Sequence, residues 1–179
     1  MKRTLAIDTK DELLDLVDEN DRVIGTVWKS KAHQNPKLFH REVAIAVFTK
    51  AGKVLLQQRS MNKVNDPGAW KVSAAGHAGA GENPKQAIAR EVKEELGLEV
   101  KPIYFNKDFT TYKNKESRFT WMYYSVLDKE TSLRFDKEEV MDAKWVDINA
   151  LEEFAKNNDY SLNSTSHKMI MELKDFLKF

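Results

Sequence analysis

The sequence contains no cysteine, so no disulfide can stabilise it, and this composition is compatible with a reducing compartment. It also lacks any apolar run approaching the roughly 20 residues that a membrane-spanning helix needs. Residues 1–17 have no long apolar core of the kind found in secretory signal peptides. These absences predict a soluble cytoplasmic protein without a membrane partner.

An excess of charge of one sign is absent as well. The 29 basic and 28 acidic residues leave a net charge of +1, so the chain as a whole offers no electrostatic argument for binding nucleic acid. Internal repeats and low-complexity linkers are missing too. At 179 residues the chain is expected to form one domain with a sizeable core, and a homodimer is compatible with these features.

Apolar and turn-forming segments alternate along the chain in a way typical of a protein with mixed strands and helices. Strand character is expected over 13–17, 23–27, 43–48, 54–58, 70–75, 119–127 and 144–146, and strands or extended segments are expected over 98–103 and 104–111. Helical character is expected over 84–96, 148–156 and 166–178, with a short helix or loop over 28–34. This order predicts an α/β (α+β) fold, a helix–mixed sheet–helix sandwich with an N-terminal β-hairpin extension.

We divide the expected domain, residues 1–179, into three parts. The hairpin extension covers about 1–36, and its first 12 residues are polar and expected to be loose. A catalytic core over 37–150 and a C-terminal helical segment over 151–179 follow.

The stretch from Gly76 to Leu98 has the clearest local pattern of a loop, a helix and a helix stop. Asn83 is a good N-cap residue, and Pro84 suits the first helical position. Gly97 stands where a left-handed C-terminal cap is favoured. Apolar residues recur every four positions and predict one buried stripe, formed by Ile88, Val92 and Leu96.

Three carboxylates share a neighbouring face of that helix. Glu91, Glu94 and Glu95 are spaced i, i+3 and i+4, so their side chains are crowded together and repel one another. A cation among them would relieve this repulsion, and ligands that are all oxygen suit Mg²⁺ or Mn²⁺. Arg90 can pair with Glu94 one turn on, or hold Glu91 in place.

The same stretch resembles the signature of the Nudix hydrolases, the family of MutT-like proteins. Their pattern is G-x5-E-x7-R-E-U-x-E-E-x-G-U, where U is a bulky aliphatic residue. A solvated charged helix is the alternative, but here the flanking loop matches as well as the charges do. The constrained positions are Gly76, Glu82, Arg90, Glu91, Val92, Glu94, Glu95, Gly97 and Leu98.

The resemblance implies the Nudix fold and the hydrolysis of a diphosphate joined to another group, X, with Mg²⁺ or Mn²⁺ as cofactor. It implies a catalytic set that includes Arg90, with a backbone carbonyl near Gly76 as a further metal ligand. The carboxylate metal ligands would be Glu91, Glu94 and Glu95.

The base that takes the proton from water is left open by the sequence. One of the glutamates in the signature could serve, or a glutamate outside it. Glu138 and Glu139 are the outside candidates, because they lie in the acidic segment after the long strand. A solvated turn is the other explanation for that pair.

Segments outside the signature resemble type 1 isopentenyl-diphosphate isomerases, which share the Nudix fold. The similarity covers about residues 13–148, through DLVDENDRVIGTVWKSKAH, LFHREVAIAVFTKAGKVLLQQRS, PGAWKVSAAGH and EEVMDAKWVDI. In that family three cations hold the diphosphate, and the matching residues here are Lys29, Arg59 and Lys63. All three lie in or beside expected loops and could converge on one anion, although solvated surface cations are the alternative.

The isomerase family also binds a metal through three histidines. The matching residues are His33, His40 and His77, three of the four histidines in the chain. The resemblance therefore implies a second metal site or phosphate contacts. Their spacing alone would say little, because a lone histidine is usually not a ligand.

Two departures argue against isomerisation, which needs an acid–base pair across the alkene. The isomerases carry a cysteine just before the GH dipeptide, where this chain has Ala75. The second partner belongs to a glutamate pair, spaced i, i+2, at the start of the long strand. An alignment without gaps places that pair at Arg118 and Thr120, with Glu116 nearby but displaced.

Three hypotheses follow: a metal-dependent hydrolase, an isomerase, and a non-catalytic binder of a nucleotide or diphosphate. The complete acidic signature favours hydrolysis, because a binder could lose one carboxylate without harm. The cations favour a small-molecule terminal diphosphate, such as a nucleoside or prenyl diphosphate, but the group X is not determined. Aromatics could stack on a base or cover a prenyl tail, although strand positions favour a core role for Trp28, Trp70, Tyr112, Trp121 and Tyr123.

Overall fold

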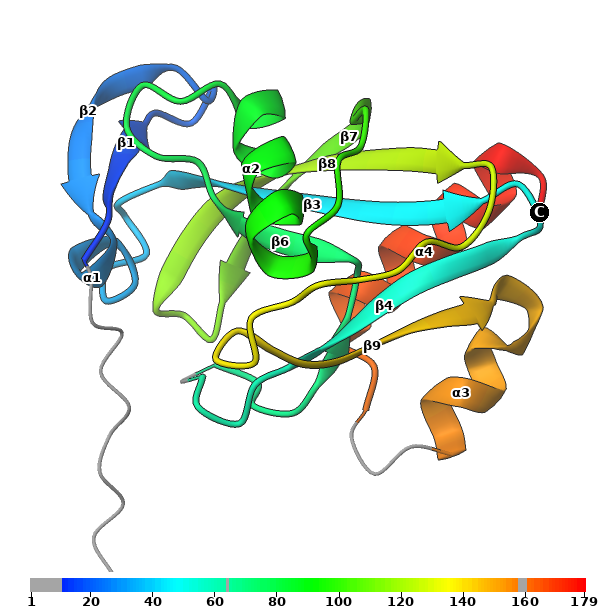
Figure 1. Ribbon diagram of the computed structural model, residues 1–179. Coiled ribbons are helices and arrows are strands. Elements are labelled where there is room, and N and C mark those ends of the chain that lie inside the picture. The colour runs from blue at the N-terminus through cyan, green and yellow to red at the C-terminus, as the bar shows by residue number, and fades with distance from the viewer. Residues whose placement is uncertain (1–10, 64, 158–160) are drawn as a thin grey trace, which may run out of the picture.

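A mixed β-sheet lies between two helices in the computed structural model, which describes residues 11–63, 65–157 and 161–179. Helix α2 covers the front of the sheet and helix α4 lies behind it (Figure 1). This arrangement confirms the predicted sandwich and its N-terminal hairpin. Most of the segment expected to be loose, 1–12, falls outside the described residues. Among the described residues, no helix is long and apolar enough to cross a bilayer.

The elements follow the predicted order, with shifted ends. The strands are β1 Leu13–Val17, β2 Val23–Trp28, β3 His40–Thr49, β4 Lys53–Arg59, β5 Trp70–Lys71, β6 Ala74–His77, β7 Ile103–Tyr112, β8 Glu116–Leu127 and β9 Val140–Asp147. The helices are α1 Lys29–Ala32, α2 Pro84–Leu96, a 3₁₀ turn η1 Ile148–Ala150, α3 Leu151–Asn157 and α4 Ser164–Leu177.

The main sheet has the strand order β5-β4-β3-β8-β7 in the described part of the chain, with β6 paired to β3 and β9 paired to β4. Strands β3 and β8 pair in parallel over their whole length, from His40 opposite Arg118 to Thr49 opposite Leu127. The neighbouring pairs, β7 with β8 and β9 with β4, are antiparallel. Because the two strands are parallel and begin near each other, their N-terminal ends lie at the same end of the sheet.

Strands β3 and β4 pair at Phe48 and Val54 and then separate, and β6 continues beside β3. Buried Ser73 bridges the separation. Its hydroxyl donates to the Leu55 carbonyl at 2.6 Å and accepts from the Val47 N–H at 2.8 Å. The predicted single strand over 70–75 is therefore wrong in detail: it is split into β5, which pairs with β4, and β6, which pairs with β3.

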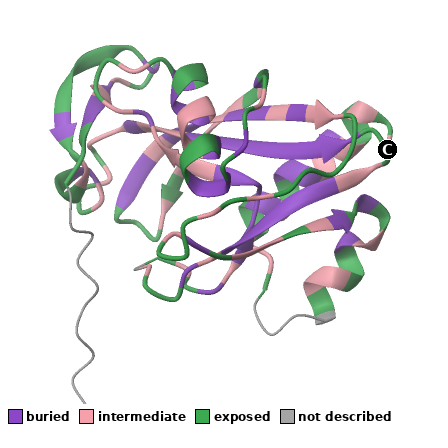
Figure 2. Cartoon of the chain, in the orientation of Figure 1, coloured by how far each residue is buried: buried purple, intermediate pink, exposed green. Residues whose placement is uncertain are grey.

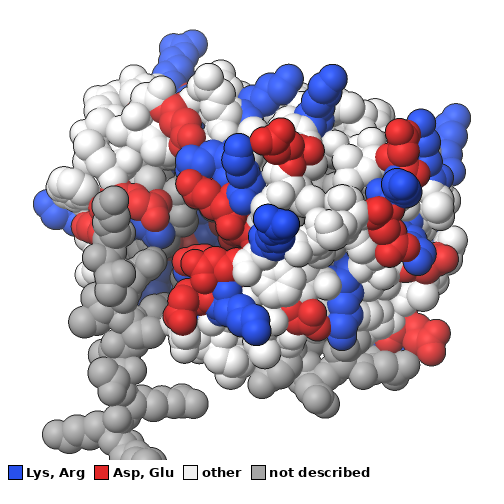
Figure 3. Space-filling view, in the orientation of Figure 1, with Lys and Arg blue, Asp and Glu red and all other residues white. Residues whose placement is uncertain are grey.

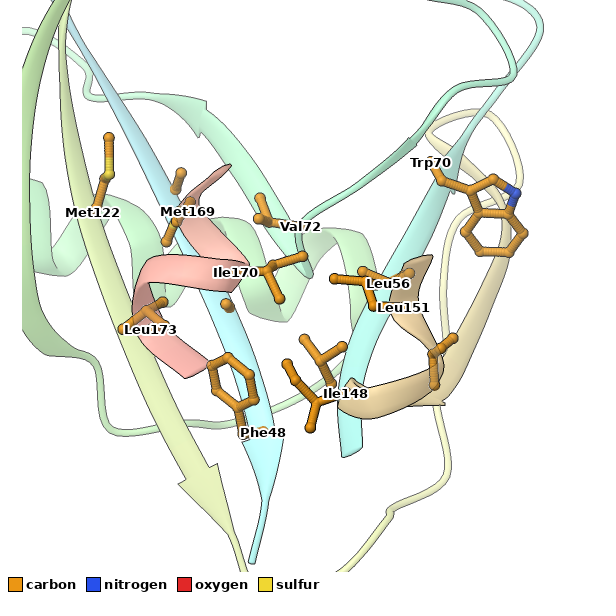
Figure 4. Packing of buried hydrophobic residues seen from close by; sticks show 14 residues of the cluster. Phe48, Leu56, Trp70, Val72, Met122, Ile148, Leu151, Met169, Ile170 and Leu173 are labelled. Atoms are coloured by element: carbon orange, nitrogen blue, oxygen red, sulfur yellow. The ribbon is translucent and has the colours of Figure 1, made fainter. Parts of the chain in front are cut away.

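The core lies on both faces of β3, which is coloured as buried along most of its length in Figure 2. Val43, Ile45 and Val47 point to the cluster under α2. The intervening residues, which include Phe48, point to the cluster under α4, where Met169, Ile170 and Leu173 meet them (Figure 4). Burial on both faces explains why this strand is apolar almost throughout.

Residues 98–102 do not form a strand, which was one of the two possibilities that the sequence left open there. Helix α2 ends at Leu96, and Gly97 adopts a left-handed φ of 67° that turns the chain back. Leu98 then packs into the core cluster under α2. Pro102 has no N–H to donate to a ladder, so strand β7 starts only after it, at Ile103.

One buried carboxylate fastens the β1–β2 hairpin to the main sheet. The Asp21 side chain is 2% exposed and accepts from Arg41 Nε at 2.6 Å and from Lys107 Nζ at 2.8 Å. Trp121 Nε1 of β8 also donates to it, at 3.1 Å. The hairpin further contacts the loop before α2, where the Gly81 N–H donates to Asp15 Oδ1 at 2.9 Å.

Replacing Asp21 by alanine should strongly destabilise the fold, because two cations and an indole N–H would lose their shared partner. We expect the free energy of unfolding to fall by about 3–5 kcal/mol in urea titrations. Asp128→Ala is the matched control, because its pair with Lys50 is solvent-exposed and should contribute little. Equal midpoints for the two variants would contradict the role of Asp21.

Candidate active site

Helix α2 begins and ends where the sequence predicted. Asn83 caps it by accepting from the Lys85 N–H at 2.9 Å, and Pro84 is its first residue. A side chain at Gly97 would approach the Arg134 carbonyl to 2.6 Å, so both the turn and the packing require glycine. The apolar stripe of Ile88, Val92 and Leu96 is fully buried and holds the helix rigidly against the sheet.

Arg90 ties the carboxylates of this helix to the preceding loop. Its guanidinium holds Glu82 in a bidentate pair, with both contacts at 3.0 Å. Its Nη1 donates to Glu91 at 2.7 Å and to Glu94 at 3.0 Å, and its Nη2 donates to the His77 carbonyl. The Arg90 hydrogen bond lowers the pKa of Glu82. The sequence posed two partners for Arg90 as alternatives, and the structure shows both.

Glu91 lies against the backbone of Gly76. A Cβ on Gly76 would fall 2.2 Å from the carboxyl carbon of Glu91, so the glycine makes room for that side chain. Burial raises the pKa of Glu91 to about 7, helped by the charge of Glu95 and opposed by Arg90. Placing a buried carboxylate among others in this way favours the binding of a cation.

Glu95 is the most buried of the three carboxylates, at 7% exposure. Its Oε2 accepts from Gln57 Nε2 at 2.6 Å and from the Ala75 N–H at 3.3 Å. Its Oε1 faces the ammonium group of Lys71 at 3.6 Å. Glu94, by contrast, has its side chain 60% exposed at the outer end of the face. The acidic face thus has an inner end at Glu95, where hydrogen bonds hold the buried carboxylate, and an outer end at Glu94, which is exposed to solvent.

The three predicted diphosphate-binding cations all line one cleft of about 1100 Å³, together with the acidic face of α2. Lys29 pairs with Glu12 at 3.2 Å, Arg59 Nε donates to the Asn65 carbonyl, and Lys63 pairs with Glu139. In Figure 3 acidic groups gather around a hollow in which basic atoms are also visible. The structure therefore places Lys29 on the same cleft as Arg59 and Lys63, which lie far from it in the sequence.

The outside glutamates lie at the rim of the same cleft. Asn62 Nδ2 donates to Glu138 at 3.1 Å, and Glu139 forms the ion pair with Lys63. Both residues belong to the segment just before β9, which leads back along β4. They are close enough to the cleft to remain candidates for the base.

The three predicted histidines meet at the end of β3. Their ring nitrogens lie within 4.8 Å of one another, and His33 Nε2 is 3.0 Å from His77 Nε2. Burial lowers the pKa of His33 to about 4 and lowers the pKa of His77 well below its ordinary value. His40 is fully buried, and its Nε2 has no hydrogen-bond partner among the described residues. Three neutral imidazoles, one of which has an unpaired ring nitrogen, fit a metal ion.

Glu116 belongs to this cluster, contrary to the sequence alignment that treated it as displaced. Its Oε2 lies 3.2 Å from His33 Nε2, and it is 3% exposed. Arg118 pairs with Glu116 and, at 2.7 Å, with Glu42. The two residues spaced i, i+2 that lie beside the histidines are therefore Glu116 and Arg118, because the start of β8 pairs with the start of β3, where His40 lies. Thr120 lies further along β8 and contacts Glu42.

Sequence reasoning also missed Lys71 and Gln57. Neither belongs to a spaced pattern, and each reaches Glu95 only because β4 and β5 pair, with Gln57 opposite Lys71. The aromatic residues do not all have the core role that their strand positions favoured. Tyr112 is one of the residues that line the cleft, whereas Trp70 packs in the core and Trp121 donates a hydrogen bond to Asp21.

Comparison with known proteins agrees with this geometry. A family model described as NUDIX domain matches residues 38–165. An isopentenyl-diphosphate Delta-isomerase of Streptomyces avermitilis is 35% identical over 155 residues, which cover 83% of this chain and 78% of that protein. Another from Burkholderia multivorans is 32% identical, covering 89% of this chain and 92% of that protein. An uncharacterized Nudix hydrolase of Listeria monocytogenes is 31% identical, covering 82% and 86%.

Solved structures show the same fold. A crystal structure of a Deinococcus radiodurans protein superposes with a TM-score of 0.70 at 22% identity, covering 88% of this chain and 97% of that chain. A MutT protein from Methanosarcina mazei superposes with a TM-score of 0.65 at 18% identity, covering 82% and 99%.

Gly76→Ala tests the fit between the loop and the acidic helix. The added methyl group should push Glu91 out of its place and lower the free energy of unfolding by about 1–3 kcal/mol. A crystal structure would show the displaced carboxylate, and a urea titration the loss of stability. Gly25→Ala is the control, because nothing lies within 4 Å of the position that its Cβ would take. An unmoved Glu91 in Gly76→Ala would refute the close fit.

Proposed function

This chain belongs to the NUDIX family, and we propose that it is a metal-dependent hydrolase of a small organic diphosphate. Water attacks one phosphorus atom of the substrate, the bridging P–O bond breaks, and the leaving phosphate oxygen carries away the bond electrons. The water loses its proton to a carboxylate of the cleft. A divalent ion, Mg²⁺ or Mn²⁺, supplies charge neutralisation of the phosphate oxygens and lowers the pKa of the attacking water.

The observation that carries this proposal is the complete acidic face of α2 held open to the cleft. Arg90 orients Glu91 and Glu94, while Gln57 and the Ala75 N–H orient Glu95. Oxygen ligands on a rigid helix are the donors that Mg²⁺ and Mn²⁺ prefer. We assign the metal to these three carboxylates and to a backbone carbonyl near Gly76.

The substrate's diphosphate would lie between the acidic face and the cations of the same cleft. Lys29, Arg59 and Lys63 supply up to three positive charges for its oxygens. The proton acceptor is one of the α2 carboxylates or one of Glu138 and Glu139 at the rim. The group X would extend toward Tyr112, which lines the cleft and offers a face for stacking.

The second candidate function is isopentenyl-diphosphate isomerisation. It is favoured by the histidine cluster with Glu116, which the resemblance to the isomerases implied in part, and by the names of the relatives. Against it stands the absence of an acid–base pair. Ala75 occupies the cysteine position of that family, and Arg118, which cannot give up a proton, stands two residues after Glu116. A non-catalytic diphosphate binder is the third candidate, but it would not need the full acidic face.

We further propose that the histidine cluster holds a second metal ion. His33, His40 and His77 are kept neutral by burial, and Glu116 adds a carboxylate oxygen at their edge. Imidazole and carboxylate together suit Mn²⁺, Fe²⁺ or Zn²⁺ better than Mg²⁺. The orphaned Nε2 of His40 is the nitrogen that gains most from such an ion.

Glu95→Gln should abolish metal-dependent phosphate release, because it removes a carboxylate charge from the inner end of the acidic face. We expect a loss of about 10²-fold or more in kcat on any diphosphate that the protein hydrolyses. A panel of nucleoside diphosphates, nucleotide sugars, prenyl diphosphates and oxidised nucleotides with Mg²⁺ or Mn²⁺ identifies that substrate. Glu99→Gln, an exposed glutamate beyond the helix, is the control. Unchanged turnover in Glu95→Gln would eliminate the proposal.

Isopentenyl diphosphate separates the first two functions. We expect no dimethylallyl diphosphate by NMR after prolonged incubation with the metal-loaded protein, because the acid–base pair is missing. Formation of that product at a catalytic rate would replace hydrolysis by isomerisation as the function. Metal-dependent binding without turnover across the whole panel would instead indicate a binder.

His40→Ala should remove the second metal. We expect elemental analysis of the protein, loaded with Mn²⁺ and then desalted, to show about one metal ion fewer per chain, because a buried ligand is lost. His167→Ala is the matched control, since that histidine pairs with Glu152 and is not part of the cluster. Equal metal content in the two variants would exclude the site.

A further inference from the structure

A buried lysine lies at the floor of the cleft and has no role in the proposed function so far. Lys71 is in β5, opposite Gln57 of β4, and its side chain is 10% exposed. Lysine is almost never buried unless it is paired. Its ammonium group lies beside Glu95, at the inner end of the acidic face.

The ammonium group faces two oxygens. Lys71 Nζ lies 3.4 Å from the Ala75 carbonyl oxygen and 3.6 Å from Glu95 Oε1. The other oxygen of Glu95, Oε2, is already taken by Gln57 and by the Ala75 N–H. The one Glu95 oxygen left for a cation therefore already has a cation beside it.

These two oxygens are of the kinds that a divalent ion would use. A carboxylate oxygen and a backbone carbonyl just before Gly76 are two of the oxygen ligands that a hard cation would need. An ammonium group and a divalent ion cannot share them, because like charges at such short range repel strongly in a partly buried site. The lysine and a metal ion therefore compete for the inner end of the acidic face.

We propose that Lys71 is a resident cation that binds Glu95 Oε1 and the Ala75 carbonyl in place of a divalent ion. Of the metal ligands assigned above, this leaves Glu91 and Glu94, at the outer end of the acidic face, for divalent ions. This inference rests on the proposed function and refines it: the site works with one divalent ion fewer than its carboxylates could hold. The ammonium group supplies the missing charge to the substrate, because it opens onto the same cleft as Arg59.

A purely structural ion pair is the competing explanation for Lys71. A lysine that only neutralises a buried glutamate would contribute to stability and would leave metal binding alone. A resident cation, by contrast, must weaken or block a metal position. The two explanations therefore differ in the number and affinity of bound divalent ions, a quantity that can be measured without any substrate.

Mn²⁺ titration followed by the electron paramagnetic resonance signal of the free ion tests the inference. Lys71→Met keeps an unbranched side chain and removes the charge. We expect it to bind one more Mn²⁺ per chain than the unmodified protein, or to bind its weakest ion at least about tenfold more tightly. Lys71→Arg keeps the charge and should match the unmodified protein.

Arg59→Met is the matched control for net charge. It removes one positive charge from the same cleft, but the guanidinium is held by the Asn65 carbonyl rather than by a carboxylate of α2. We expect it to leave the number of bound Mn²⁺ ions unchanged. The histidine cluster contributes equally to every variant, so differences between them report on the acidic face.

Equal Mn²⁺ number and affinity in folded Lys71→Met and in the unmodified protein would overturn the inference and leave the proposed hydrolysis intact. If instead Glu94→Gln does not reduce Mn²⁺ binding in the unmodified protein, the metal site of the proposed function itself fails. Should Lys71→Met not fold, Lys71→Gln decides by the same criteria, because its amide can still donate to the Ala75 carbonyl without carrying a charge.

Discussion

The interaction on which the site depends is the set of hydrogen bonds made by Arg90. Carboxylates at i, i+3 and i+4 on one helix face repel one another, and a single guanidinium among them offsets part of that repulsion. Arg90 binds two of them and also Glu82 and the His77 carbonyl, so helix, loop and strand end are held by one side chain. Because its donors have a fixed geometry, the carboxylates are oriented before any ion arrives.

The sheet supplies the second constraint. Strands β3 and β4 separate after one pairing, and Ser73 satisfies the backbone groups exposed by that separation. As a result, β5, which contains Lys71, pairs with β4, whereas β6, which contains Gly76 and His77, pairs with β3. One irregularity in the sheet therefore sets the distance between the acidic face, the buried lysine and the histidines.

Two groups of candidate metal ligands thus lie beside one cleft: the acidic face of α2 and the histidine cluster with Glu116. They suit different ions, because one offers only oxygen and the other mainly nitrogen.

The acidic helix, its caps and its buried stripe could be derived from the sequence, because all depend on contacts within about four residues along the chain. The fold class followed from the order of strands and helices, and the family from the spacing of nine positions. Strand ends and the split between β5 and β6 could not be derived, because they depend on which strands pair. The positions of Glu116, Lys71 and Gln57 were likewise decided only by tertiary structure: β8 beside β3 brings Glu116 to His33, and β5 beside β4 brings Lys71 and Gln57 to Glu95. Contacts between residues far apart in sequence leave no periodic trace, so only the folded chain shows them.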